Sequence, residues 1–151
     1  MDKQQLIALV HPRLKLIRTE REYTQDQMAD SVGISKKTLV QLEKGRQELG
    51  WTVAVAICAV YRESTILRAV LGEDPVELVE MAVHSEIHSQ QLTSAVVTWW
   101  TDIGMWQQYK LQQHTVSGHY RIIGEGNQRL YSSAVKEKAL AEFKKYMDIM
   151  N

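Results

Sequence analysis

Apolar side chains recur every three or four residues through the first half of the chain, the spacing of short helices that bury one face. Side chains that cap helices stand at the expected starts, and glycines stand at two of the expected ends. The pattern predicts five helices, which run from Pro12 through LKLIRTERE, from Thr24, from Ser35, from Trp51 to Tyr61 and from Thr65 to Leu71. The fourth is nearly all apolar, so we expect the others to pack around it.

The pattern changes after residue 72. Asp74 and Pro75 open a further predicted helix, and residues 93–104 have the pattern of another short one. Alternating apolar and polar residues then predict strands at YKLQQH, HYRII and QRLYSS, with GEGN as a hairpin turn between the last two. The closing segment is predicted to be a helix with an apolar stripe. That stripe consists of Val135, Leu140, Phe143, Tyr146 and Met150.

The predicted fold is therefore mainly α. It has a five-helix headpiece at residues 1–72, followed at residues 73–151 by a small α+β region with a β-hairpin or a three-stranded antiparallel sheet. Trp99, Trp100 and Trp106 fall in the second region, where they could form its core, a ligand pocket or a dimer interface.

Charge and cysteine content add to this picture. The chain has 151 residues and no net charge, which argues against a protein that is basic throughout. The first region holds 11 lysines and arginines against 8 aspartates and glutamates, and the second holds 7 against 10, so an anionic partner is expected on the first. The single cysteine, Cys58, lies in an apolar run and is expected to be a buried thiol. No apolar stretch reaches the length of a membrane span and no signal peptide is evident, so we expect a cytoplasmic protein.

The second and third predicted helices are joined by a turn that contains Gly33, the arrangement of a helix-turn-helix unit. Ala29 supplies the small residue needed where the two helices cross, and Ile34 begins the apolar set that fills the angle between them. Lys36 and Lys37 follow the second cap directly, where the positive end of the helix dipole disfavours cations. Placing them there is useful if this end of the helix faces phosphates and guanine acceptors in the DNA major groove.

The residues from about 14 to 61 resemble the repressor-type helix-turn-helix family of the phage lambda and phage 434 repressors and Cro. The resemblance rests on Thr24, Gln25, Met28, Ala29, Gly33, Ile34, Ser35, Thr38, Leu39, Leu42, Glu43, Gly45 and Arg46. It implies an internal salt bridge between Arg18 and Glu43, both of which would then be structural. It covers about a third of the chain, and no family is recognised in residues 73–151.

The resemblance also implies a role for each exposed position. Gln25 is expected to contact a phosphate through its side chain or backbone amide. Contacts with base edges are expected from Lys36, Lys37 and Gln41, because lysine prefers guanine and glutamine prefers adenine. Contacts with the DNA backbone are expected from Thr38, Lys44 and Arg46. Val40 either meets a thymine methyl group or is an ordinary surface residue.

Enzymatic functions find less support. His84 and His88 stand four residues apart on a predicted helix, but on its polar side, so a solvated surface is favoured over a metal site. No Ala-Gly or Cys-Gly bond is present for the self-cleaving protease domain of some relatives. We expect no catalytic residues, no metal and no cofactor.

These observations predict a sequence-specific DNA-binding transcriptional regulator, and the habits of the resembled family favour a repressor. It should bind double-stranded DNA as a homodimer and read a near-palindromic operator through the helix after Ser35. Residues 73–151 would serve dimerisation, or sense a small-molecule or protein effector. The alternative is an antitoxin-like module, whose second region binds a partner protein while the headpiece autoregulates its operon. A third reading places an uncharacterised enzyme in that region.

Overall fold

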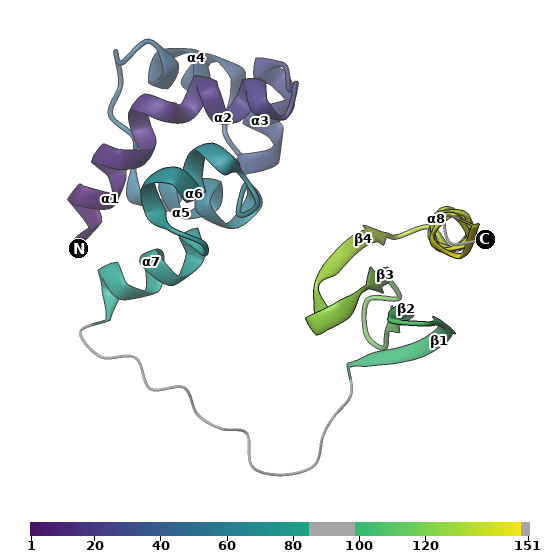
Figure 1. Ribbon diagram of the computed structural model, residues 1–151. Helices are drawn as coiled ribbons and strands as arrows, with labels where there is room; N and C mark the ends of the chain where they lie inside the picture. Colours follow the sequence, from purple (N-terminus) through teal and green to yellow (C-terminus); the bar gives the residue numbers. More distant parts are fainter. Residues whose placement is uncertain (85–98, 149–151) are drawn as a thin grey trace. The chain divides into compact units, whose positions relative to one another are not determined.

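The computed structural model describes residues 1–84 and 99–148 (Figure 1). The chain divides into two compact units, Met1–Gln90 and Gln91–Asn151. The first is helical in its described part, and the second combines an antiparallel sheet with one helix. The mainly α fold with a small α+β region is therefore confirmed, although its sheet has four strands.

All five helices predicted in the headpiece are present, each close to its expected bounds. They are α2 (Leu14–Glu20), α3 (Gln25–Val32), α4 (Lys36–Glu43), α5 (Trp51–Val60) and α6 (Thr65–Leu71). The predicted caps form at the starts of α3 and α4: Thr24 makes a capping box with Gln27, and Ser35 accepts a hydrogen bond from the backbone of Thr38. Ala54, Ile57 and Cys58 of α5 are buried, as expected for the central helix.

Two further helices flank these five in the first unit. Before them lies α1 (Lys3–Val10), which continues through the short 3-10 turn η1 (His11–Arg13) into α2. The predicted helix at Asp74 is α7 (Pro75–Val83), and it packs against α1, α5 and α6. The first compact unit thus runs past the boundary expected at residue 72, because the apolar side of α7 covers this core.

The new boundary changes the distribution of charge. Met1–Gln90 holds 11 lysines and arginines against 13 aspartates and glutamates, whereas Gln91–Asn151 holds 7 against 5. The net charges are therefore −2 and +2, opposite in sign to those of the two regions divided at residue 72. The difference arises because five acidic residues, Glu73, Asp74, Glu77, Glu80 and Glu86, belong to the first unit.

The second unit is a four-stranded antiparallel meander in the order β1-β2-β3-β4, followed by a helix. Its elements are β1 (Trp100–Trp106), β2 (Tyr109–His114), β3 (Tyr120–Ile123), η2 (Glu125–Asn127), β4 (Arg129–Ser133) and α8 (Lys136–Asp148). The helix predicted at residues 93–104 is wrong from residue 100 onward, where aromatic and β-branched residues pair with β2. Residues 93–98 lie outside the described ranges. The predicted GEGN turn does join β3 to β4.

Helix α8 packs on one face of this sheet. Ala139 and Phe143 are buried against Leu111 of β2 and Ile122 of β3. The ring of Phe143 also lies over Gly104 of β1, where a Cβ atom would approach its Cε1 to 3.2 Å. A glycine at this point of β1 therefore lets the helix come close to the sheet.

The apolar stripe predicted for α8 is only partly right. Phe143 and Tyr146 do pack on the sheet, together with Ala139 and Met147. Val135 and Leu140 are instead 43% and 45% exposed, because the buried face follows positions 139, 143 and 146–147. Met150 lies outside the described residues.

Candidate nucleic-acid interface

Helices α3 and α4 meet through a short turn whose backbone geometry depends on Gly33. This residue is left-handed, with φ of 76°, and its amide donates to the carbonyl groups at the end of α3. The amide of Ile34 donates to the carbonyl oxygen of Ala29 at 3.0 Å, which closes the turn. Beneath it, Ala29, Leu39 and Leu42 are buried in the core of the unit. These contacts leave the other side of α4 facing solvent.

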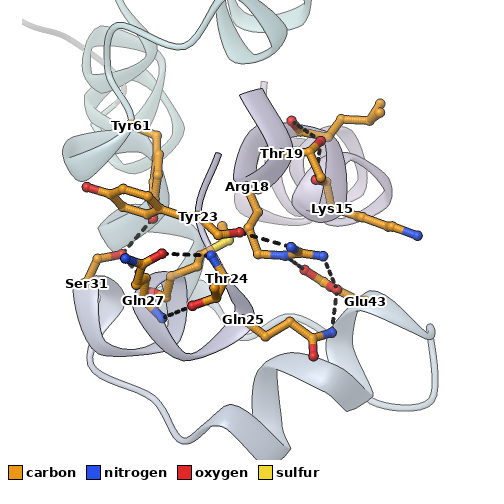
Figure 2. A network of polar contacts seen from close by, with 12 residues as sticks. Lys15, Arg18, Thr19, Tyr23, Thr24, Gln25, Gln27, Ser31, Glu43 and Tyr61 are labelled. Carbon is orange, nitrogen blue, oxygen red and sulfur yellow. Dashed lines mark hydrogen bonds and ion pairs between the residues drawn. The ribbon is translucent and has the colours of Figure 1, made fainter. Parts of the chain in front are cut away.

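A buried polar network ties the two ends of this helix pair to α2 (Figure 2). The guanidinium group of Arg18 donates to both carboxylate oxygens of Glu43, from Nε at 2.6 Å and from Nη2 at 3.2 Å. It also donates from Nη1 to the carbonyl oxygen of Tyr23 at 3.0 Å. The side chains of Arg18 and Glu43 are only 13% and 5% exposed, so solvent screens this pair little.

The protonation of Glu43 reflects this setting. Burial favours the neutral carboxyl group, but the hydrogen bonds from Arg18 and Gln25 outweigh it and lower the pKa of Glu43 below its ordinary value. The carboxylate therefore stays charged at neutral pH and holds the end of α4 against α2.

Gln25, for which we expected a phosphate contact, is part of the same network. Its side-chain amide donates to Oε2 of Glu43 at 3.0 Å. The side-chain amide is thus engaged inside the protein, whereas the backbone amide, the other group expected to reach a phosphate, lies at the start of α3.

Lys36, the first residue of α4, has a partner that we did not predict. Its Nζ lies 2.8 Å from Oδ2 of Asp26 in the first turn of α3, and the two side chains are 55% and 66% exposed. The ion pair offsets the unfavourable position of this cation at a helix N-terminus. Spacing alone offered no signal for it, since Asp26 and Lys36 belong to different helices.

The remaining predicted positions lie around the exposed side of α4. Lys37, Lys44 and Arg46 are exposed, and none of them forms an ion pair with any residue in the described ranges. Gln41 is half-buried. Thr38 is half-buried too, and its hydroxyl group lies 2.8 Å from that of Ser35. Val40 is also half-buried, which places it between the core and the exposed side.

The C-terminal end of α4 has support that the sequence did not reveal. The Nε2 atom of His11 donates to the carbonyl oxygen of Leu42 at 2.9 Å. No local pattern indicates this contact, because the two residues lie 31 positions apart in sequence. At the other side of the unit, Ser31 of α3 and the hydroxyl group of Tyr61 share a hydrogen bond of 2.7 Å.

A metal-binding role gains no support in the described part of the chain. No group of three or more histidine, cysteine, aspartate or glutamate side chains is placed there to hold an ion. His84 directly follows α7, and its predicted neighbour His88 lies outside the described residues. None of the described helices is long and apolar enough to cross a membrane.

Comparison with known protein families matches residues 13–71 to the helix-turn-helix domain. The matched segment begins just before α2 and ends with α6, so it contains the α3–turn–α4 unit and the Arg18–Glu43 pair. Comparisons with curated proteins and with solved structures gave no match. Residues 13–71 are thus similar to the helix-turn-helix domain, and they lie in a longer compact unit that also contains α1 and α7.

Proposed function

We propose that the protein is a sequence-specific DNA-binding regulator of transcription that reads the major groove with α4. The observation that carries this proposal is the α3–turn–α4 unit, fixed from behind by the Arg18–Glu43–Gln25 network and bearing exposed cations at both ends of α4. A helix presented in this way can insert its first turn between the two phosphate backbones.

Base recognition is assigned to Lys36, Lys37 and Gln41. Lys37 forms no ion pair in the described ranges and is the best placed to reach guanine acceptors. Lys36 has to leave Asp26 or share it before it can contact a base. The half-buried Gln41 would be brought to adenine as the helix enters the groove.

Backbone contacts are assigned to residues around this helix. Lys44 and Arg46 follow the last turn of α4 and would pair with phosphates on one strand. Gln25 would approach the other strand through its backbone amide, since its side chain is bound to Glu43. Thr38 would contribute through its hydroxyl group.

We further propose the repressor type of regulation, a near-palindromic operator and a homodimer. One recognition helix reads too few base pairs to select a site in a genome, and two-fold pairing places two such helices about 34 Å apart, one turn of DNA. The unit Gln91–Asn151 would hold the dimer or bind a small-molecule or protein effector. We also propose that the protein acts in the cytoplasm.

The assignment of base contacts is tested in two steps. Bound sequences are first selected from a random duplex library to define the operator, and the affinities of alanine variants for the operator and for random DNA are then measured. Lys37→Ala and Gln41→Ala should lose about 1–3 kcal/mol on the operator and little on random DNA. Lys44→Ala and Arg46→Ala should weaken both alike and reduce the salt dependence of binding. Lys144→Ala, an exposed lysine of α8, is the control. Equal losses on both DNAs for Lys37→Ala and Gln41→Ala would overturn the assignment.

The dimer is tested by sedimentation of the full chain and of a fragment that ends at residue 84, which retains α7. The full chain should sediment as a dimer at micromolar concentration, and the fragment should be monomeric and bind the operator more weakly. A monomeric full chain, or a fragment that binds as tightly as the whole protein, would contradict the proposal.

A further inference from the structure

The face of the sheet turned away from α8 carries polar, cationic and aromatic side chains. Residues on facing strands pair in register there, so Trp100 lies beside His114, Asp102 beside Gln112, and Gln112 beside Arg121. We call this the open face. It consists of Trp100, Asp102, Met105, Lys110, Gln112, His114, Arg121, Ile123, Arg129 and Ser132.

Arg121 is the central cation of the open face. Its guanidinium group lies 3.9 Å from the ring centroid of Trp100, and its Nε donates to Oε1 of Gln112 at 2.8 Å. No carboxylate in the described ranges forms an ion pair with it, because Asp102 pairs with Lys110 at 3.3 Å and accepts from Gln112 at 2.6 Å. The planar group is thus held in a fixed orientation with its outer nitrogens left for another acceptor.

A second arginine lies close enough to repel the first. Burial lowers the pKa of Arg121, the charge of Arg129 lowers it further, and Asp102 offsets part of this. Arg121 and Arg129 lie on adjacent strands, where Arg121 pairs with Ser132 and Arg129 with Ile123. A bound anion would relieve the repulsion between their charges. The unit Gln91–Asn151 also has a net charge of +2.

Aromatic rings stand at the β1 side of these cations. Trp99 is 54% exposed, and its ring stacks on His114 with centroids 6.4 Å apart and planes at 17°. Trp100 meets the same imidazole edge-on at 4.7 Å. One large ring is therefore oriented by its neighbours, with about half of its surface left to solvent.

We propose that the open face binds single-stranded nucleic acid, with phosphates on Arg121 and Arg129 and a base stacked on Trp99. Exposed aromatics beside cations on a sheet suit this ligand, because every base has a face to stack and every nucleotide carries a phosphate. Neighbouring strands lie about 4.8 Å apart, so β1 and β4 are separated by roughly 14 Å. A single nucleotide is too short to reach both Trp99 and Arg129, whereas an extended strand crosses the whole face.

The test uses the full chain and labelled single strands of about twelve nucleotides, DNA and RNA, followed by fluorescence anisotropy at about 50 mM salt. Arg121→Gln/Arg129→Gln should weaken binding at least about tenfold, because two phosphate contacts are lost. Trp99→Ala should weaken it at least about fivefold through loss of stacking. The backbone carbonyl oxygen of Trp99 accepts a hydrogen bond from the amide of Thr115, so Trp99→Ala keeps this backbone contact.

The matched control is Lys138→Gln/Lys144→Gln, which removes the same charge from exposed positions of α8. It should change affinity less than about twofold if the open face is the site. Thermal melts check that each variant is folded. If the double variant melts below wild type, Arg129→Gln alone replaces it in the binding assay, because Arg129 is exposed. Adenosine monophosphate should compete far more weakly than the strand.

Several results would overturn the proposal. They are no binding of either strand by the full chain, equal losses in the lysine control, or competition by the mononucleotide as strong as by the strand. The variant Lys37→Ala/Arg46→Ala separates this site from the headpiece. It should reduce operator binding and leave single-strand binding in place, so the function proposed for α4 and the function proposed for the open face fail independently.

Discussion

Removing the carboxylate of Glu43 should destabilise the first unit strongly. Glu43→Ala deletes three acceptor contacts, two from Arg18 and one from Gln25, at a side chain that is 5% exposed. Among the described residues, it also leaves the guanidinium group of Arg18 with the carbonyl oxygen of Tyr23 as its one acceptor. Breaking a buried pair from one side costs about 3–5 kcal/mol, and the remaining bond to Tyr23 favours the lower end, about 3 kcal/mol. That is a large share of the ~5–15 kcal/mol of a typical domain.

Urea unfolding followed by circular dichroism at 222 nm measures this loss, because most of the described helices belong to the first unit. Glu48→Ala, an exposed glutamate just beyond α4, is the control and should change stability by less than about 0.5 kcal/mol. Operator binding per folded molecule should stay close to wild type just below the unfolding transition. Unchanged stability with lost operator binding would show that Glu43 contacts DNA instead.

The same variant has a defined pH dependence. The pKa of Glu43 is lowered in the folded protein, so its stabilising effect is fully present above the unfolded value of about 4.3 and is lost as pH falls through the folded value. The stability difference between wild type and Glu43→Ala should therefore be constant near neutrality and should shrink below about pH 4. A difference that grows on acidification would refute the account of the network.

Other predictions concern the frame of each unit. Glu20→Gln should lower the stability of the first unit by about 1 kcal/mol in urea unfolding, because its carboxylate accepts from the amide of Thr65 at 2.8 Å at the start of α6 and is partly screened by solvent. Gly104→Ala should cost the second unit about 1–2 kcal/mol in a thermal melt, because the new methyl group would press on Phe143. Burial raises the pKa of Cys58 to about 11, so its alkylation at neutral pH should be slow until urea unfolds the protein.

The helix-turn-helix unit could be predicted from the sequence because its determinants are local. The capping box at Thr24, the left-handed Gly33 and the cap at Ser35 each act within a few residues, and they set the bounds of α3 and α4. Apolar periodicity then identified which side of each helix is buried. The predicted bounds of all five helices needed no knowledge of distant contacts.

Features set by distant contacts were missed or misplaced. The segment at β1 contains residues that suit a short helix, and only pairing with β2 makes it a strand. Helix α7 itself was predicted. Its place in the first unit was not predicted, because its partners α1 and α5 lie far from it in sequence. Likewise, the roles of His11 and Asp26 depend on atoms 31 and 10 residues away.

The charge of the first unit leads to a last prediction. Its net charge is −2, so affinity for DNA has to come from where charges lie within it. Helices α4 and α7 lie at opposite ends of this unit (Figure 1). Glu80 belongs to α7, so we expect physiological salt, which screens charges over roughly 8 Å, to weaken its effect on phosphates at α4. Asp26 is beside Lys36. Asp26→Asn should therefore tighten binding to random duplex DNA and steepen its salt dependence by about one ion, whereas Glu80→Gln should change neither. Equal effects of the two variants in a salt titration would show that net charge, and not the placement of charges around α4, governs binding.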